Sequence, residues 1–126
     1  MNDIKISLAI ISDDILFWNL FIPLLVLNSP AMEIQICTTY AEINKKFQES
    51  KYNLILIDGG ISSFSSIEVI QYIRMRKLVI APIWFFPEIQ SDSYFYKAKE
   101  MGVTRLIIKP FDPYLIVNEI KNLFNK

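Results

Sequence analysis

Several residue types that build common active sites are scarce in this sequence or missing from it. There is no histidine, which excludes histidine metal ligands, Ser–His–Asp triads and a phosphohistidine donor within the chain. The single cysteine, Cys37, excludes an intramolecular disulfide, and its apolar surroundings predict a buried, unreactive thiol. Because 13 basic and 13 acidic residues balance, no net charge draws the chain to nucleic acid, and we expect no direct nucleic-acid contact.

A membrane span and a secretory signal are missing too. The apolar run Ile15–Leu27 is shorter than the ~20 residues that cross a bilayer. Asp13 and Asp14 interrupt the apolar segment before it, which excludes a signal peptide. The 126 residues, 52% of them hydrophobic, are enough for one packed domain over residues 1–126. We therefore expect a single cytoplasmic domain that does not contact a membrane.

Short apolar runs and longer segments of helical periodicity alternate five times along the chain. The predicted strands are Ile4–Ile11, Glu33–Cys37, Asn53–Ile57, Leu78–Phe86 and Val103–Ile108. Helices are predicted over Ile15–Leu27, from Thr39 through Phe47, around Ile67, Ile70 and Ile73, over Ser91–Met101, and after Asp112. Such alternation predicts an α/β fold, in which a doubly wound, five-stranded parallel sheet is covered by helices on both faces.

Local signals mark where several helices begin, bend and end. Thr39 and Glu42 form a capping box, Gly102 is a C-terminal cap, and Pro113 suits the first turn of the last helix. Pro23 should bend the first helix or weaken its second half, because a backbone hydrogen bond is lost there.

Charged side chains stand at the carboxyl ends of three predicted strands. Asp13 and Asp14 follow the first strand, Asp58 follows the third, and Lys109 follows the fifth. Functional groups of parallel α/β sheets gather at this edge, so we expect these side chains to meet. Converging carboxylates need a counter-charge, and Mg²⁺ fits, held by the three aspartates and the backbone carbonyl of Gly60. With Lys109 as a point charge for phosphoryl oxygens, Asp58 is the candidate nucleophile of a phosphoryl transfer.

Each of these residues also has a simpler interpretation. Asp13 and Asp14 would serve equally as N-terminal caps of the first helix. Asp58, followed by two glycines, would suit an ordinary turn, and Lys109 by itself is typical of a solvated surface. The aromatic cluster Tyr94–Tyr96 fits both partner contact and internal packing, whereas the aromatic end of the fourth strand is expected in the core.

Taken together, the motifs resemble those of a response-regulator receiver domain along nearly the whole chain. The matching elements are the paired acids Asp13 and Asp14, Asp58 after L-I-L-I, the K-P-F motif that begins at Lys109, and the K-A-K-E-M-G-V segment 97–103. The resemblance implies a flavodoxin-like sheet with strand order 2-1-3-4-5. It also implies Mg²⁺ at the paired acids, phosphorylation of Asp58, contact of Lys109 with the phosphoryl group, and a cis peptide bond after Lys109.

The same resemblance implies a place in two-component signalling. The partner would be a sensor histidine kinase or a phosphotransfer protein, and the fourth and fifth helices would form a homodimer. At most, the chain would catalyse its own aspartyl phosphorylation and dephosphorylation. One alternative is a pseudo-receiver that binds partners without phosphorylation. Another is a flavodoxin-type mononucleotide binder, which the two aspartates after the first strand oppose because they would repel a phosphate.

The sequence departs from the receiver pattern at the positions that usually switch. Receivers place Thr or Ser after the fourth strand, where this chain has Pro87, which has neither a hydroxyl nor a backbone N–H. Leu106 stands where Tyr or Phe is usual, and Ser62 and Ser66 replace a common proline and glycine. These losses affect signalling more than chemistry, so we expect Asp58 to accept phosphate without the usual Thr–Tyr switch.

Overall fold

The computed structural model describes residues 6–28, 31–61 and 64–124, and it confirms the α/β architecture. Five parallel strands form one sheet in the order β2-β1-β3-β4-β5. The strands are β1 (Ile6–Ile11), β2 (Met32–Cys37), β3 (Leu54–Asp58), β4 (Ile83–Phe86) and β5 (Arg105–Leu106). The helices are α1 (Ile15–Asn28), α2 (Tyr40–Glu49), α3 (Ser66–Gln71) with its π-helical continuation η1 (Tyr72–Arg76), α4 (Asp92–Glu100) and α5 (Pro113–Phe124).

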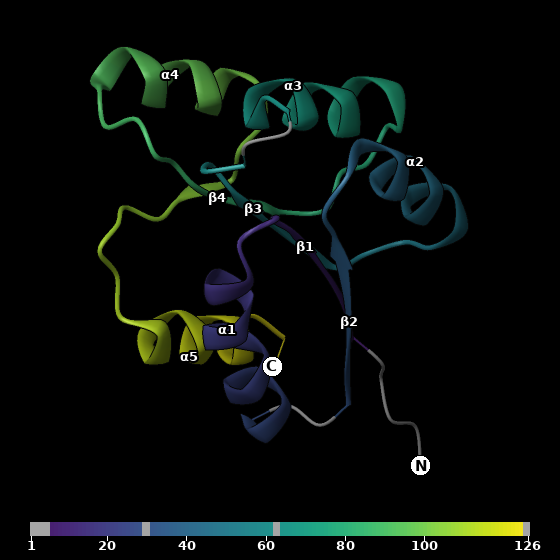
Figure 1. The fold of residues 1–126 in the computed structure, drawn as a ribbon, viewed down its shortest axis with the longest axis vertical. Coiled ribbons are helices and arrows are strands. Elements are labelled where there is room, and N and C mark those ends of the chain that lie inside the picture. Colours follow the sequence, from purple (N-terminus) through teal and green to yellow (C-terminus); the bar gives the residue numbers. More distant parts are fainter. Residues whose placement is uncertain (1–5, 29–30, 62–63, 125–126) are drawn as a thin grey trace.

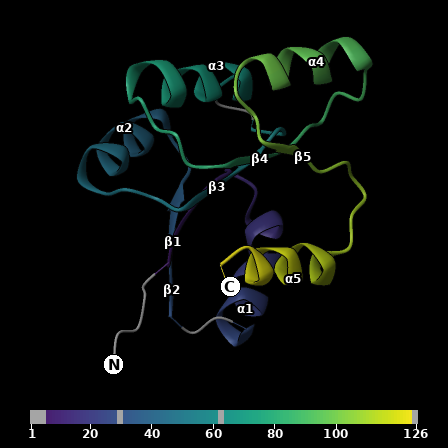
Figure 2. The same cartoon turned by 180° about the vertical axis from the view of Figure 1, so that it is seen from behind.

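Helices cover both faces of the sheet, and each face has its own apolar core. Helices α1 and α5 lie together on one face, and α2, α3 and α4 lie on the other (Figure 1). The view from behind shows the same division (Figure 2). Trp84 and Phe86 of β4 belong to the core under α1 and α5, and Phe85 belongs to the opposite core. All three are buried, as expected for a strand whose side chains alternate between two covered faces.

The fourth strand is shorter than the sequence predicts. The strand expected over Leu78–Phe86 begins only at Ile83. Leu78 has a φ of 55°, a left-handed conformation that a strand does not contain, and the side chain of Ile80 is 95% exposed. The prediction was wrong because these apolar residues form an irregular segment that leads into the sheet, and hydrophobicity alone does not distinguish such a segment from a strand.

Other boundaries also differ from the prediction. The strand expected over Val103–Ile108 is reduced to β5, an edge strand with β4 as its neighbour. Helix α1 continues past Pro23 to Asn28. Helix α3 begins at Ser66, one residue before Ile67, the first residue of the predicted helical periodicity. Ser62 lies outside the described residues. None of the helices in the described part of the chain combines the length and hydrophobicity that a bilayer crossing requires.

The predicted caps of α2 and α4 are present. Thr39 Oγ1 accepts a hydrogen bond from Glu42 N at 3.1 Å. In turn, Glu42 Oε1 accepts a hydrogen bond from the backbone N–H of Thr38 at 2.9 Å. Gly102 follows α4 with a φ of 106°, a conformation that favours glycine.

Cys37 ends β2 and is fully buried, as predicted. Burial raises the pKa of its thiol from 9.0 to about 11, with Glu42 adding to the effect and Lys46 opposing it.

We expect an aromatic disulfide reagent at mildly alkaline pH to modify the Cys37 thiol of native protein at least ~100-fold more slowly than that of urea-unfolded protein. The folded state binds the thiol proton of Cys37 more tightly than the unfolded state does. The contribution of this proton to the free energy of unfolding is therefore fully present below pH 9 and is lost as the pH rises to about 11. Rapid labelling of the native protein would contradict this expectation.

Candidate functional site

Strand β3 delivers Asp58 to the carboxyl edge of the sheet, where its side chain is 1% exposed. Its Oδ1 accepts hydrogen bonds from Lys109 Nζ at 3.0 Å and from Gly60 N at 3.1 Å. Its Oδ2 accepts a hydrogen bond from Ser12 Oγ at 2.9 Å. The structure thus brings Asp58 and Lys109 together across 51 residues of sequence. A buried carboxylate held in this way has a fixed position and a paired charge, which are the requirements for a nucleophile that receives an anionic group.

Lys109 reaches the site from the segment after β5, and its peptide bond to Pro110 is cis, as the resemblance implied. Its ammonium also donates to Glu88 Oε1 at 2.6 Å and lies 5.7 Å from the ring centroid of Phe17. Partial burial by itself would lower the pKa of Lys109, but the hydrogen bonds and charges of Glu88 and Asp58 outweigh it and raise that pKa. Lys109 is therefore a firmly protonated cation between two carboxylates.

The paired acids after β1 lie beside this cluster, and one of them has a different partner. Asp14 Oδ1 accepts a hydrogen bond from Leu16 N at 2.9 Å, so its carboxylate caps the start of α1. Ser12 Oγ accepts a hydrogen bond from Asp14 N at 3.0 Å and donates to Asp58, which ties the two aspartates together. Asp13 is partly buried in the same loop.

The predicted magnesium ligands are therefore not all assembled around one point. Among the described residues, no group of three or more Asp, Glu, Cys or His side chains is arranged to hold a metal ion. Asp58 and Gly60 meet through a hydrogen bond, whereas the Asp14 carboxylate is turned to the helix. Magnesium binding by Asp13, Asp14, Asp58 and the Gly60 carbonyl stays a prediction.

Three residues of the site were not predicted as site residues from the sequence. Ser12 is fully buried and donates to Asp58, and Ser66 Oγ donates to the backbone carbonyl of Asp58 at 3.0 Å. Glu88 contacts Lys109 from the carboxyl end of β4. Each lies within two residues of the end of a strand or at the start of the helix that follows one. Their positions at the functional edge of the sheet were the available signal.

The loop after Asp58 packs tightly against the end of β4. Gly59 N donates to Phe86 O at 2.8 Å. A Cβ added at Gly59 would come within 2.7 Å of that carbonyl oxygen and 2.9 Å of Pro87 Cα, so a larger residue would force the two segments apart. Pro87 is buried directly after β4, and Leu106 is partly buried in β5 opposite Phe85. Of the residues that depart from the receiver pattern, Pro87 thus lies just after β4, and Leu106 is the last residue of β5.

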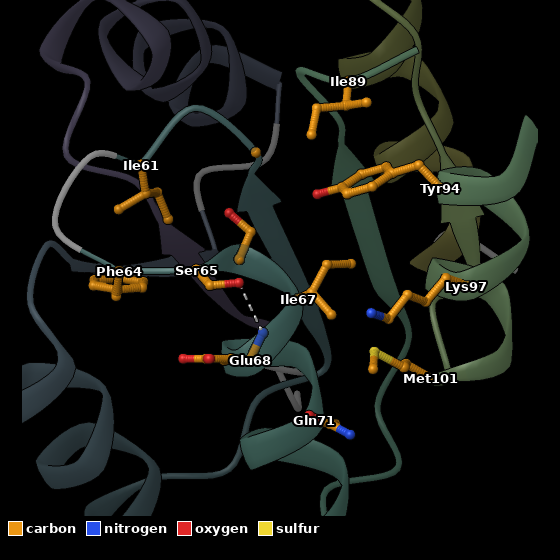
Figure 3. Close-up of a pocket in the computed structure, with 12 residues that line it drawn as sticks. Ile61, Phe64, Ser65, Ile67, Glu68, Gln71, Ile89, Tyr94, Lys97 and Met101 are labelled. Atoms are coloured by element: carbon orange, nitrogen blue, oxygen red, sulfur yellow. Dashed lines mark hydrogen bonds between the residues drawn. The ribbon is translucent and has the colours of Figure 1, made fainter. Parts of the chain in front are cut away.

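A pocket of about 600 Å³ opens beside Gly59, between α3 and α4. Figure 3 shows the Tyr94 hydroxyl and the Lys97 amine directed into it from α4, with Ile67 of α3 opposite and Ile89 at its rim. The Tyr94 ring packs on Phe85, with 6.2 Å between the ring centroids, whereas Tyr96 is 68% exposed. The aromatic cluster of α4 therefore divides between packing and exposure.

A family model described as the response regulator receiver domain matches residues 8–121. The chain belongs to this family. It is a receiver domain of a two-component response regulator, which confirms the fold and general role that the motifs indicated. The family membership gives no support to a flavodoxin-type mononucleotide binder.

Individual relatives of this receiver domain agree with the family assignment. The transcriptional regulatory protein CrdR of Helicobacter pylori (strain ATCC 700392 / 26695) is 26% identical over 84 residues, which is 67% of this chain and 39% of that protein. Among solved structures, the signal receiver domain of the DNA binding response regulator protein (merR) from Colwellia psychrerythraea 34H superposes with a TM-score of 0.85 at 17% identity. That match covers 97% of this chain and 100% of the other. The chemotaxis response regulator CheY4 of Vibrio cholerae gives a TM-score of 0.79 at 18% identity over 96% of this chain and 100% of its own.

Proposed function

We propose that this receiver accepts a phosphoryl group on Asp58 from a partner histidine kinase or phosphotransfer protein. The observation that carries the proposal is the 3.0 Å contact between the buried Asp58 carboxylate and the Lys109 ammonium. An Asp58 oxygen forms a bond to phosphorus while the phosphorus–nitrogen bond of the donor phosphohistidine breaks. The bonding electron pair leaves with the imidazole nitrogen, and Lys109 offsets the negative charge of the transferred oxygens.

Mg²⁺ suits the oxygen ligands of this site. A carboxylate offers about four lone-pair positions, and hydrogen bonds use three of those of Asp58. Mg²⁺ needs one or two carboxylates together with waters and phosphate oxygens. Asp13 and Asp14 belong to the loop that Ser12 ties to Asp58, so they are the further carboxylates within the same part of the fold. We infer that Asp13, Asp14, Asp58 and the Gly60 carbonyl would hold the ion, which would neutralise the phosphoryl oxygens.

The proposal is tested by incubating the purified chain with acetyl phosphate, or with beryllofluoride, in excess Mg²⁺. Intact mass spectrometry should show one phosphoryl group per chain, and peptide mapping should place it on Asp58. We expect chelation of Mg²⁺ to slow the reaction at least ~100-fold, because Lys109 would then be left to neutralise the charge of the phosphoryl oxygens without the metal ion. Failure of both reagents to give an adduct with Mg²⁺ present would refute the proposal.

In this proposal the chain's own chemistry is limited to gaining and losing the phosphoryl group. We expect the protein to be located in the cytoplasm. A pseudo-receiver that works without phosphorylation is not favoured, because Asp58 and Lys109 are both in place. The homodimer through α4 and α5 stays a prediction. Its supporting observation is that Tyr96 of α4 and Tyr114 and Leu115 of α5 are exposed apolar residues.

A further inference from the structure

Glu88 occupies the mouth of the acceptor site. Its Oε1 lies 2.6 Å from Lys109 Nζ, closer than the 3.0 Å between that amine and Asp58 Oδ1. A Cβ added at Gly60 would lie 2.6 Å from Glu88 Oε1, so this carboxylate rests on the backbone of the loop that follows Asp58. The Glu88 side chain is 54% exposed, whereas that of Asp58 is 1% exposed. Lys109 is therefore held from inside the protein by one carboxylate and from the solvent side by another.

We propose that Glu88 is a positioning residue that holds Lys109 and competes for it with the phosphoryl group received by Asp58. This rests on the proposed phosphorylation of Asp58, and it assigns to Glu88 control over the rate of that reaction. The carboxylates of Asp58 and Glu88 share the single ammonium of Lys109. This leaves an excess negative charge at the entrance of the acceptor site. A phosphodonor is itself an anion, so it is repelled by Glu88 as it approaches Asp58.

Phosphorylation would reverse the balance of this competition. The phosphoryl group carries a charge of about −1.5 to −2 and three strong acceptor oxygens, so it draws Lys109 away from Glu88. The Glu88 carboxylate is then left without its cation and beside a new anion, which repels it. Because Pro87 provides no hydroxyl at this strand end, the change of partner at Lys109 is the way in which the end of β4 senses the phosphoryl group.

The released segment leads directly to the pocket between α3 and α4. Lys109 holds the segment after β4 at two points, because Gln90 Nε2 also donates to the Lys109 carbonyl at 2.9 Å. Ile89 lies between these two contacts and lines the pocket together with Tyr94 and Lys97 (Figure 3). Release of Glu88 therefore removes one of the two contacts that hold this wall of the pocket, and the effect of phosphorylation reaches the α3–α4 face of the domain.

The rate of phosphorylation by acetyl phosphate in excess Mg²⁺ tests the first part of the inference. We expect Glu88→Gln and Glu88→Ala both to react roughly tenfold faster than the native protein, because repulsion of the donor is removed. Raising the salt to ~1 M should shrink this difference by screening, which a purely structural effect of the substitutions would not do. Glu68→Gln is the matched control, since Glu68 is an exposed carboxylate on α3 at the same pocket. Its rate should stay within about twofold of native.

The amide NMR signals of Ile89, Gln90 and Tyr94 test the second part. In the native protein, beryllofluoride with Mg²⁺ should shift these signals, and in free Glu88→Gln they should already be displaced toward the adduct positions. Native rates in both Glu88 variants, or signals that stay unchanged in an adduct, would overturn the role of Glu88 while leaving Asp58 as the acceptor. An absence of adduct in every protein would overturn both proposals.

Discussion

Asp58→Asn is expected to form no detectable acyl phosphate, a loss of at least ~1000-fold in rate, because a carboxamide is not a nucleophile toward phosphorus. The free energy of unfolding should stay within ~1 kcal/mol of native. Asparagine has the same shape, and its Oδ1 can accept the hydrogen bonds from Lys109 and Gly60. Its Nδ2 can donate to Ser12 Oγ, which now donates to Asp58 and has room to accept. Lys109 keeps its ion pair with Glu88.

Two measurements on the same sample check this prediction. Intact mass spectrometry after acetyl phosphate treatment reports the chemistry, and urea denaturation reports the stability. Asp92→Asn is the matched control, because Asp92 is an exposed aspartate in the first turn of α4, and this variant should be phosphorylated like the native protein. Phosphorylation of Asp58→Asn at a comparable rate would place the acceptor on another residue.

Arg74→Ala is expected to lower the free energy of unfolding by ~3 kcal/mol, since hydrogen bonds to a charged donor contribute ~1.5–3 kcal/mol each and water replaces part of them. Arg74 lies in η1, and its guanidinium donates to Gly102 O from Nε at 3.1 Å and from Nη2 at 2.8 Å. Its Nη1 donates to Val79 O at 2.8 Å and to Ala81 O at 2.7 Å. One side chain thereby joins the π-helix, the irregular segment before β4 and the turn after α4.

Arg74→Lys separates charge from geometry at this position. A lysine ammonium carries the same charge, but it lacks the planar fork that reaches three carbonyls at once, so we expect a loss of ~1–2 kcal/mol. Urea denaturation followed by tryptophan fluorescence gives both values. A loss below ~1 kcal/mol for Arg74→Ala would mean that these carbonyls are satisfied by water at little cost.

The residue order along the chain was enough to predict most of the fold. Strands β3 and β4 are apolar on both sides because two helical layers cover them, and their runs of apolar residues stand out against the helical periodicity around them. The prediction was wrong over Leu78–Pro82, where the chain is irregular and the side chains of Leu78 and Ile80 are exposed. Their conformation depends on the contacts of Arg74 with the carbonyls of Val79 and Ala81, which no local pattern encodes.

By itself, the sequence determined the α/β class and which side chains follow each strand, and therefore that Asp58 and Lys109 would stand at one edge of the sheet. The cap that Asp14 forms on α1 is a local contact that the sequence already offered as one interpretation. Only the tertiary structure decided the long-range pairs at that edge, in which Ser12 binds Asp58 and Glu88 binds Lys109. These two pairs join residues that are 46 and 21 positions apart in the sequence. The physical reason is that a charged side chain pairs with whichever partner the assembled strand ends place within about 3 Å, and that distance exists only after the sheet has formed.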